Sequence, residues 1–483
     1  MRIPEAGPPL QGFDDFIRAT MRDWKVPGLA MAIVKNGEVI FSRGFGLRDV
    51  VHDLKMTPQT RFAIGSCTKA FTTMVMGMLA DEGKLEWDAP VRKYLPTFRM
   101  YDAFATERMT PRDLVTHRSG LPSHDFVWYR SSRTRQELFD RLQYLEPSKD
   151  FRGAFQYQNL MYMAAGYLVG QIAGQSWEDV VQQRLFDRLG MTSSNFSVDL
   201  SQQGDDYALP YQEEKGKVKE IPFYAETQAI APAGAIVSTV TDMSRWLLLH
   251  LNRGKHGDAQ LISEGQLAQM HTPQIVAPEL ARHKEISHTN YALGWVVASY
   301  RGHTLVEHSG GIDGFSALTT LLPQHRIGLV VLSNMSITPV PRIVIFNACD
   351  RLLGLDELPW NDRLREEIAA LETAEKKLKE ESESDRVPDT HPSHPLNAYT
   401  GNFENPGYGL LSVESADEQL KGTFNSTTFP LKHHHYDIFR LDSKWLNLST
   451  RMSFSTNLKG DIESLAVQLE PEVKAIVFQR VPG

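Results

Sequence analysis

The sequence predicts an α+β fold, in which helices cover an antiparallel sheet and a small all-β barrel follows at the C-terminus. Three observations support this prediction. Strand-like segments occur at both ends of residues 1–355, a long and mostly helical region separates them, and short β-like segments fill residues 396–483. Two sets of strands separated by helices can pair in one antiparallel sheet on which the helices pack.

The first strands are expected at residues 29–34 and 38–42. Asn36-Gly37 lies between them and is a strong signal for a two-residue hairpin, because both residues readily adopt positive φ angles. The antiparallel sheet therefore begins near the start of the chain.

Helices are expected after this hairpin. Apolar residues recur at helical spacing from Phe71 to Leu79, and Gly83 follows where a C-terminal cap would lie. A capping box at Thr110-Pro111-Arg112-Asp113 predicts a second helix that ends near Gly120.

A third helix and the returning strands complete this region. Thr239 and Asp242 repeat the capping spacing before an apolar helical pattern. The later strands, rich in β-branched, leucine and aromatic residues, are expected at residues 292–299, 304–308, 315–322 and 327–332.

The character of the chain changes twice beyond this point. Residues 361–386 are dense in Glu, Lys and Arg around a thin apolar stripe, which predicts a solvent-exposed helix. Residues 387–395 are rich in Pro, His, Ser and Asp, which indicates a boundary. We therefore expect a large domain over residues 1–355, a charged helical linker over 356–395 and a β-barrel over 396–483.

The composition is that of a soluble globular protein, with 41% hydrophobic and 23% charged residues and no apolar run long enough to span a membrane. A net charge of −8, without a lysine or arginine tract, gives no reason to expect nucleic acid or a membrane as a partner. Residues 1–11 lack the apolar core of a signal peptide. Together with the scarcity of cysteine (Cys67 and Cys349), this favours the cytoplasm.

The candidate chemistry centres on Ser66 and Lys69. No GxSxG, P-loop, HExxH or paired CxxC motif occurs in the chain. Ser66-Cys67-Thr68-Lys69 stands at the head of the first expected helix, where a spacing of three places both side chains on one face. A neutral amine can activate a serine hydroxyl, which requires a lysine pKa about 3 units below its usual value, as burial can provide.

Two further segments carry polar groups suited to the same reaction. Tyr157 and Asn159 precede another helical pattern, so the phenol can carry a proton and the amide can bind a substrate carbonyl. In His308-Ser309-Gly310-Gly311, at the end of a strand, the glycines let a substrate approach, and the Gly311 N–H can donate to an oxyanion. Taken singly, each segment is more often structural.

Together, Ser-x-x-Lys, Tyr-x-Asn and His-x-Gly in this order resemble the serine β-lactamase and penicillin-binding-protein superfamily. The resemblance covers about residues 12–355. Within the superfamily, Tyr-x-Asn resembles class C β-lactamases, D-alanyl-D-alanine carboxypeptidases, D-aminopeptidases and related esterases. His308, where many members have lysine, is similar to the peptidase and esterase branch.

The resemblance implies a role for each residue. The implied roles are nucleophile for Ser66, acid and base for Lys69 and Tyr157, substrate binding for Asn159, His308 and Gly310, and oxyanion hole for the N–H groups of Ser66 and Gly311. Which of Lys69 and Tyr157 takes the first proton stays open.

The implied function is cleavage of amide bonds in small peptides through an acyl-enzyme, without a metal or other cofactor. An esterase, an acyltransferase or a β-lactamase would use the same residues, because pocket shape selects the substrate and the acceptor. A non-catalytic ligand-binding protein of the same fold is the alternative from a different class.

Three other features of the sequence concern the C-terminal region, the histidines and Cys67. Residues 397–409 resemble the lipocalin-like C-terminal domain of some peptidases of this group, which implies a role at the active-site entrance and in homo-oligomerisation. His433, His434 and His435 are not expected to bind a metal, because neighbouring side chains of a strand point to opposite faces. Cys67 is expected to be a small buried residue.

Overall fold

The structure is a computed structural model that describes residues 8–224, 227–281, 283–384, 386–416, 419–443, 446 and 448–482. Nine antiparallel strands of these residues form one sheet in the order β10-β11-β12-β13-β14-β15-β1-β2-β3. The N-terminal hairpin therefore joins the later strands, as predicted. The strands are β1 (Gly28–Lys35), β2 (Glu38–Asp49), β3 (Leu54–Lys55), β10 (Ile275–Val276), β11 (Ile286–Tyr291), β12 (Val296–Tyr300), β13 (His303–Ile312), β14 (Phe315–Leu322) and β15 (Ile327–Ser333).

Strand β1 lies inside the sheet and is buried on both sides. Leu29, Met31 and Ile33 pack into one apolar core, whereas Ala30 and Ala32 pack into a second core on the opposite face, because successive side chains of a strand alternate. The prediction of an antiparallel sheet covered by helices is confirmed, and helices cover both faces of the sheet.

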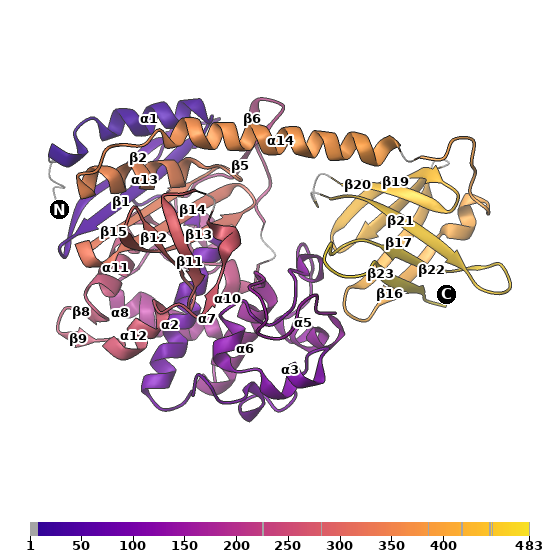
Figure 1. The fold of residues 1–483 in the computed structure, drawn as a ribbon, viewed down its shortest axis with the longest axis horizontal. Coiled ribbons are helices and arrows are strands. Elements are labelled where there is room, and N and C mark those ends of the chain that lie inside the picture. Colours follow the sequence, from indigo (N-terminus) through magenta and orange to yellow (C-terminus); the bar gives the residue numbers. More distant parts are fainter. Residues whose placement is uncertain are drawn as a thin grey trace.

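The helices are divided between the two faces of the sheet (Figure 1). Helices α1 (Phe13–Asp23) and α13 (Val340–Leu353) cover one face, whereas α11 (Val240–Leu251) contacts β1 and β15 on the other, with α2 (Thr68–Asp81) and α6 (Asn159–Ala173) beside it. The remaining helices are α3 (Ala103–Arg108), α4 (Pro111–Leu114), α5 (Arg135–Arg141), α7 (Trp177–Val181), α8 (Asp187–Leu189), α9 (Val198–Gln202), α10 (Ala231–Gly234) and α12 (Glu264–Met270). Short strand pairs are formed by β4 (Phe62–Ala63) with β7 (Val237–Ser238), β5 (Tyr211–Glu214) with β6 (Lys217–Glu220), and β8 (Lys255–His256) with β9 (Ala259–Gln260).

Helix α2 is buried on all sides. Every residue from Thr68 to Leu79 is buried, and α6, α10 and α12 pack around the helix. It begins before the apolar pattern at Phe71, because it continues directly from a 3₁₀ turn, η2 (Gly65–Cys67). A charged side chain, Lys69, is thereby carried into the core, where it needs polar partners.

The helix predicted to end near Gly120 is shorter than expected. Helix α4 spans only 4 residues, although its capping box is present. His117 and Gly120 have φ angles of 56° and 85°, and such left-handed residues end a helix. The carboxylate of Asp113 accepts a hydrogen bond from Arg118, which holds the chain folded back beside the helix end.

Two predicted strands also differ from the structure. Residues 292–295 form a turn before β12, because Gly294 has a φ of 80° and approaches α2, where a Cβ would lie 3.0 Å from the Ala70 Cα. The segment that starts at His308, expected at the end of a strand, lies inside β13, which continues to Ile312 and pairs with β14 from Val306 to Ile312.

The C-terminal strands form the predicted closed barrel. Helix α14 (Trp360–Ser384) precedes it and reaches from the sheet towards the barrel (Figure 1). Aromatic side chains fill the barrel interior, among them Phe403, Phe424, Phe439 and Phe478, each at most 1% exposed. The strands are β16 (Gly401–Asn405), β17 (Gly409–Ala416), β18 (Gln419–Phe424), β19 (Thr427–His435), β20 (Ile438–Ser443), β21 (Leu448–Thr456), β22 (Ile462–Val467) and β23 (Ile476–Arg480). The domain boundaries at 355 and 395 stay a prediction.

The barrel packs against the helical region. The Asn425 side-chain amide donates to the backbone carbonyls of Phe126 (3.0 Å) and Tyr129 (2.8 Å), and Arg133 donates to the Tyr408 carbonyl (2.7 Å). The apolar interior of the barrel is continuous with the core around α2 and α6. None of the described helices combines the length and apolarity needed to cross a membrane.

Candidate active site

Ser66 is presented by the 3₁₀ turn that leads into α2. Strand β4 delivers the chain to this turn, and Gly65 enters it with a φ of 50°, which suits glycine. A Cβ at Gly65 would lie 2.7 Å from the Gly311 nitrogen, so the turn is in close backbone contact with β13. Ser66 itself is half-buried and lines a cavity.

Lys69 lies one helical turn after Ser66 and is fully buried. Its Nζ is 2.9 Å from the Ser66 Oγ, 2.8 Å from the Asn159 Oδ1 and 2.9 Å from the Ala233 carbonyl oxygen. Burial lowers the pKa of Lys69 to about 7, although the charge of Asp125 opposes this shift. The neutral amine can therefore donate to the two carbonyl oxygens and accept the hydrogen of the serine hydroxyl.

Tyr157 and Asn159 reach the same point from the start of α6. Gln158 caps this helix by accepting from the Leu160 N–H at 2.7 Å, which fixes the two residues on either side of it. The Tyr157 ring centroid is 4.8 Å from the Lys69 Nζ. Tyr157 is 36% exposed, but desolvation around its hydroxyl raises the pKa of Tyr157 above its usual value, while a hydrogen bond with Ser66 opposes this rise. Tyr157 is therefore a neutral phenol at physiological pH.

Gly310 and Gly311 bring the edge of β13 against the turn that holds Ser66. A Cβ at Gly310 would overlap the Ile64 carbonyl oxygen and lie 3.2 Å from the Ser66 nitrogen, whereas a Cβ at Gly311 would meet open space. Gly310 thus permits the close approach, and Gly311 lines the cavity together with Ser66.

His308 has hydrogen bonds at both ring nitrogens inside the protein. Nδ1 is 2.6 Å from the Ser309 carbonyl oxygen and Nε2 is 2.9 Å from the Tyr291 hydroxyl. Burial, and then the charge of Lys69, lower the pKa of His308 to about 3. The side chain is 3% exposed, so this uncharged imidazole lies behind the wall of the site.

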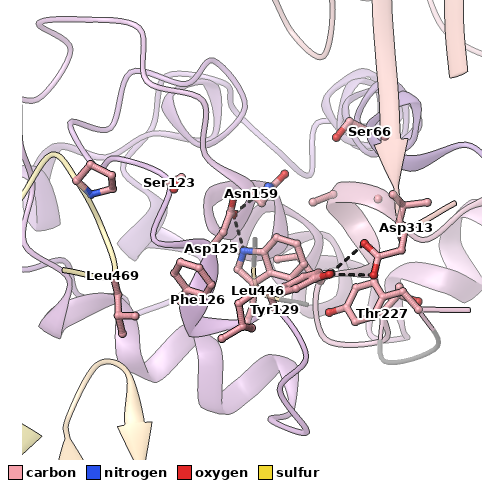
Figure 2. Close-up of a pocket in the computed structure, with 18 residues that line it drawn as sticks. Ser66, Ser123, Asp125, Phe126, Tyr129, Asn159, Thr227, Asp313, Leu446 and Leu469 are labelled. Atoms are coloured by element: carbon pink, nitrogen blue, oxygen red, sulfur yellow. Dashed lines mark hydrogen bonds between the residues drawn. The ribbon is translucent and has the colours of Figure 1, made fainter. Parts of the chain in front are cut away.

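A cavity of about 440 Å³ opens beside Ser66 (Figure 2). Of the residues predicted for the site, Ser66, Asn159 and Gly311 line it, whereas Lys69 and His308 support it from behind. Its walls are mostly aromatic and apolar, and the barrel contributes part of one wall. The aromatic wall residues are Phe126, Trp128, Tyr129 and Tyr224, and the barrel residues are Leu446, Leu469 and Pro471.

Asp125 is a site residue that the sequence analysis missed. It lines the cavity, and its Oδ1 accepts hydrogen bonds from the Trp128 Nε1 (2.8 Å) and the Asn159 Nδ2 (3.2 Å). Burial raises the pKa of Asp125, whereas the hydrogen bonds from Asn159 and Trp128 oppose this rise. An acidic residue among aromatic residues in the segment 124–129 was the available signal, but nothing in the sequence linked it to Asn159.

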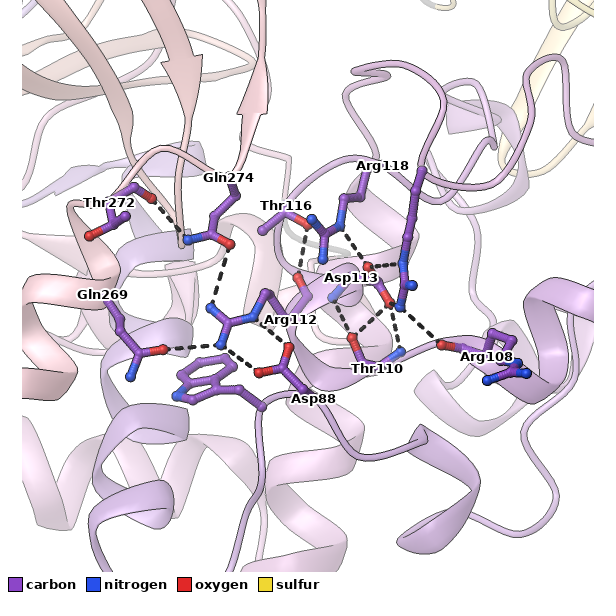
Figure 3. Close-up of polar contacts among 12 residues, drawn as sticks. Asp88, Arg108, Thr110, Arg112, Asp113, Thr116, Arg118, Gln269, Thr272 and Gln274 are labelled. Atoms are coloured by element: carbon purple, nitrogen blue, oxygen red, sulfur yellow. Dashed lines mark hydrogen bonds and ion pairs between the residues drawn. The ribbon is translucent and has the colours of Figure 1, made fainter.

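A buried polar network holds the segment that leads to Asp125 (Figure 3). The Asp113 carboxylate is inaccessible to solvent and accepts from Thr110, Arg118 and Arg152, with Arg118 Nε at 2.6 Å and Arg152 Nη2 at 2.6 Å. Burial alone would raise the pKa of Asp113, but these partners hold it below its usual value. The loop after α4 is thereby fixed against the body of the protein.

Two other sequence expectations concern cysteine and metal. Cys67 is buried beneath the site, and burial raises the pKa of its thiol to about 12, so it is not a reactive thiolate. Among the residues that the structure describes, no group of three or more His, Cys, Asp or Glu side chains is arranged to hold a metal ion.

Comparisons with known sequences extend over both parts of the chain. The family model described as Beta-lactamase matches residues 13–345, and a domain of unknown function (DUF3471) matches residues 385–480. Unguisins hydrolase from Aspergillus campestris is 27% identical over 434 residues, covering 85% of this chain and 79% of that protein. Protein flp from Staphylococcus aureus is 28% identical over 349 residues, covering 69% of this chain and 64% of that protein.

Solved structures show the same fold. An octameric penicillin-binding protein homologue from Pyrococcus abyssi has a TM-score of 0.64 at 24% identity, covering 97% of this chain and all of that one (100%). A class C β-lactamase from Rhodobacter sphaeroides has a TM-score of 0.57 at 20% identity, covering 71% of this chain and 99% of that one.

Proposed function

Since the chain belongs to the Beta-lactamase family of serine hydrolases, we propose that it cleaves amide bonds of small peptides through an acyl-enzyme formed on Ser66. The observation that carries the proposal is the 2.9 Å contact between the Lys69 Nζ and the Ser66 Oγ beside an open cavity. The proton transfers of this scheme need only lysine and tyrosine side chains.

Lys69 is the first base in this proposal. A pKa of about 7 leaves much of the amine neutral at physiological pH, and the amine already contacts the serine hydroxyl. The raised pKa of Tyr157 keeps the phenol protonated and makes it a poor first base. The contacts therefore favour Lys69 over Tyr157, an assignment that the motifs alone left open.

The later steps use the backbone N–H groups at Ser66 and Gly311 and the phenol of Tyr157. As the serine oxygen attacks, the N–H groups of Ser66 and Gly311 stabilise the oxyanion, because β13 lies against the turn that carries Ser66. Tyr157 gives its proton to the leaving amine and is reprotonated from Lys69, whose Nζ lies over its ring. Water then cleaves the acyl-enzyme and restores the serine hydroxyl.

Asn159 and His308 have different positions in this scheme. Asn159 lines the cavity and orients Lys69 through its Oδ1. Its Nδ2 donates one hydrogen to Asp125, which leaves the second amide hydrogen to bind the substrate carbonyl. Both ring nitrogens of His308 are already hydrogen-bonded. We therefore assign His308 to positioning the wall of the site through Tyr291, with substrate binding left to Asn159 and the edge at Gly310.

Turnover of matched amide and ester substrates tests the proposal. Peptidyl p-nitroanilides and p-nitrophenyl esters with the same acyl group are compared in wild type and in Ser66→Ala. We expect amide cleavage in wild type and none in the variant, whose fold circular dichroism verifies. Ester turnover without amide cleavage would instead indicate an esterase, and wild-type activity in Ser66→Ala would overturn the role of Ser66.

We also propose that the chain self-associates through the barrel. The support is the octameric state of the Pyrococcus abyssi homologue, whose fold matches 97% of this chain. Light scattering of the intact protein tests this proposal, and a monomer at all concentrations would contradict it.

A further inference from the structure

We propose that the active-site cavity contains a subsite for a positively charged amino group of the substrate, formed by Asp125 and the aromatic side chains around it. This inference rests on the proposed hydrolase at Ser66, because it names the substrate class that this site selects.

Asp125 has an unused acceptor in the cavity. Its Oδ1 accepts from the uncharged N–H donors of Trp128 and Asn159. In the described part of the chain, no donor is paired with its Oδ2, and Oδ2 is not among the buried polar atoms that lack a partner. This oxygen therefore reaches the open cavity that Asp125 lines.

The surroundings leave this negative charge largely uncompensated. Glu470 lies behind the same segment at 3% exposure, and its Oε2 accepts from the Ser123 hydroxyl (2.8 Å) and the His124 backbone N–H (2.9 Å). Burial lowers the pKa of His124, so it supplies no cation at neutral pH. The charge of Lys69 lowers the pKa of Asp125, but the Lys69 Nζ hydrogen-bonds to Ser66, Asn159 and a backbone carbonyl rather than to Asp125. A pKa of about 7 also leaves much of this amine neutral at physiological pH.

The second acidic residue of the cavity is in a different state. Asp313 is ion-paired with Arg130 at 2.9 Å and accepts from the Tyr129 hydroxyl at 2.8 Å. Its charge is therefore compensated within the protein. Asp125 is therefore the carboxylate of the cavity to which a substrate cation would bind most favourably, because a partly buried charge without a partner is costly.

The walls suit an ammonium group as well. Phe126, Trp128 and Tyr129 line the cavity next to Asp125 in the chain, and Tyr224, which also lines it, packs against Tyr129 with the ring centroids 5.2 Å apart. Aromatic faces attract cations through their negative π surfaces. Among the described residues that line the cavity there is no lysine or arginine, so a substrate carboxylate finds no opposite charge there.

Matched p-nitroanilides test the subsite. The first pair is alanine p-nitroanilide with a free α-amine and its N-acetyl form, each in both configurations. The third substrate is Nα-acetyl-lysine p-nitroanilide, whose only free amine is on the side chain. We expect the free amine to raise kcat/KM about tenfold or more over the N-acetyl-alanine form, the size of a single cation contact. Comparison of the substrate with a free α-amine and the substrate with a free side-chain amine shows which amine the subsite binds.

Asp125→Asn is the decisive variant. Its amide oxygen can still accept from Trp128 and Asn159, so the positioning of Asn159 is retained while the charge is lost. We expect the ratio of kcat/KM for the free-amine form over the N-acetyl-alanine form to fall to about one, whatever the change in absolute turnover. Asp140→Asn, which removes an exposed carboxylate on α5, is the matched control and should keep the preference.

Two failures can be told apart. Equal turnover of the amine and N-acetyl forms in wild type, or an unchanged preference in Asp125→Asn, would overturn the subsite while leaving the hydrolase in place. Absence of any turnover together with absence of a fluorophosphonate adduct would overturn the proposed function itself.

Discussion

Lys69 is the residue on which the chemistry depends. A lysine with three polar contacts and no accessible surface is held where its charged form is disfavoured, and its pKa falls to about 7 for that reason. The Ser-x-x-Lys spacing predicted that the two side chains meet, because residues three apart share a helix face. The spacing could not predict Asp125 or the two hydrogen bonds of His308, because those depend on segments that are distant in sequence.

The pH dependence of catalysis follows from Lys69. Because the base must be neutral, kcat/KM for an uncharged ester should rise with pH along a limb with an apparent pKa near 7 and level off above it. Stopped assays from about pH 5 to about pH 9 measure this limb. A profile that is flat through neutrality would contradict a lysine base.

Two adjacent glycines provide a matched pair of variants. Gly310→Ala should lower the free energy of unfolding by about 1–3 kcal/mol, because its Cβ would overlap the Ile64 carbonyl oxygen. Gly311→Ala should change stability by only about 0.5 kcal/mol, because a Cβ there meets open space. Denaturant titrations compare them, and equal stability would show that β13 does not press against the turn at Ser66.

At the scale of elements, the sequence predicted those whose signals are local. The Asn36-Gly37 hairpin and the Thr239 cap agree with the structure, because turn and capping chemistry involve neighbouring residues. The predicted lengths of α4 and β12 were wrong, because contacts with other segments of the chain determine where these elements begin and end. Arg118 and Arg152 hold Asp113, and α2 packs against Gly294.

The Asp113 network gives a prediction about stability. Asp113→Asn should cost about 2–4 kcal/mol at neutral pH, because it leaves two arginines without their buried partner. The pKa of Asp113 is lowered in the folded state, so its stabilisation is present above the unfolded pKa and is lost as pH falls through the folded pKa. The difference between wild type and variant should therefore shrink in acid.

Asp88→Asn is the control for this network. Asp88 pairs with Arg112 but its side chain is 72% exposed, so the variant should cost only about 0–1 kcal/mol. Thermal unfolding of the two variants at neutral and acidic pH measures both effects. Equal losses in both variants would contradict the role assigned to Asp113.

At the scale of the whole molecule, the barrel holds the segments that carry the site. Glu470 accepts from Ser123 and from the His124 backbone, and Glu472 accepts from Gln156 at 2.9 Å. The residues of the helical region that make these contacts lie next to Asp125 and Tyr157 in the sequence. The sequence predicted a barrel from its short strands and turns. Its docking could not be predicted, because the contacts of Glu470 join residues that lie 346 and 347 positions apart in the sequence.

Loss of a contact between the barrel and the segment before Asp125 should therefore lower the activity at Ser66. Glu470→Ala removes the acceptor for Ser123 and His124, so kcat/KM should fall about tenfold or more as the segment carrying Asp125 loses its fixed position. Glu463→Ala, at an exposed position of β22, should leave kcat/KM unchanged. Equal activity of the two variants would show that the barrel docks without positioning the site.

In the proposed mechanism, the Ser66 hydroxyl, activated by Lys69, forms a covalent acyl-enzyme. Intact mass after incubation with a fluorophosphonate, followed by peptide mapping, tests it most directly. We predict one adduct per chain on the peptide that contains Ser66, and none in Ser66→Ala. An unmodified wild-type protein, or an adduct that persists in Ser66→Ala, would contradict the account.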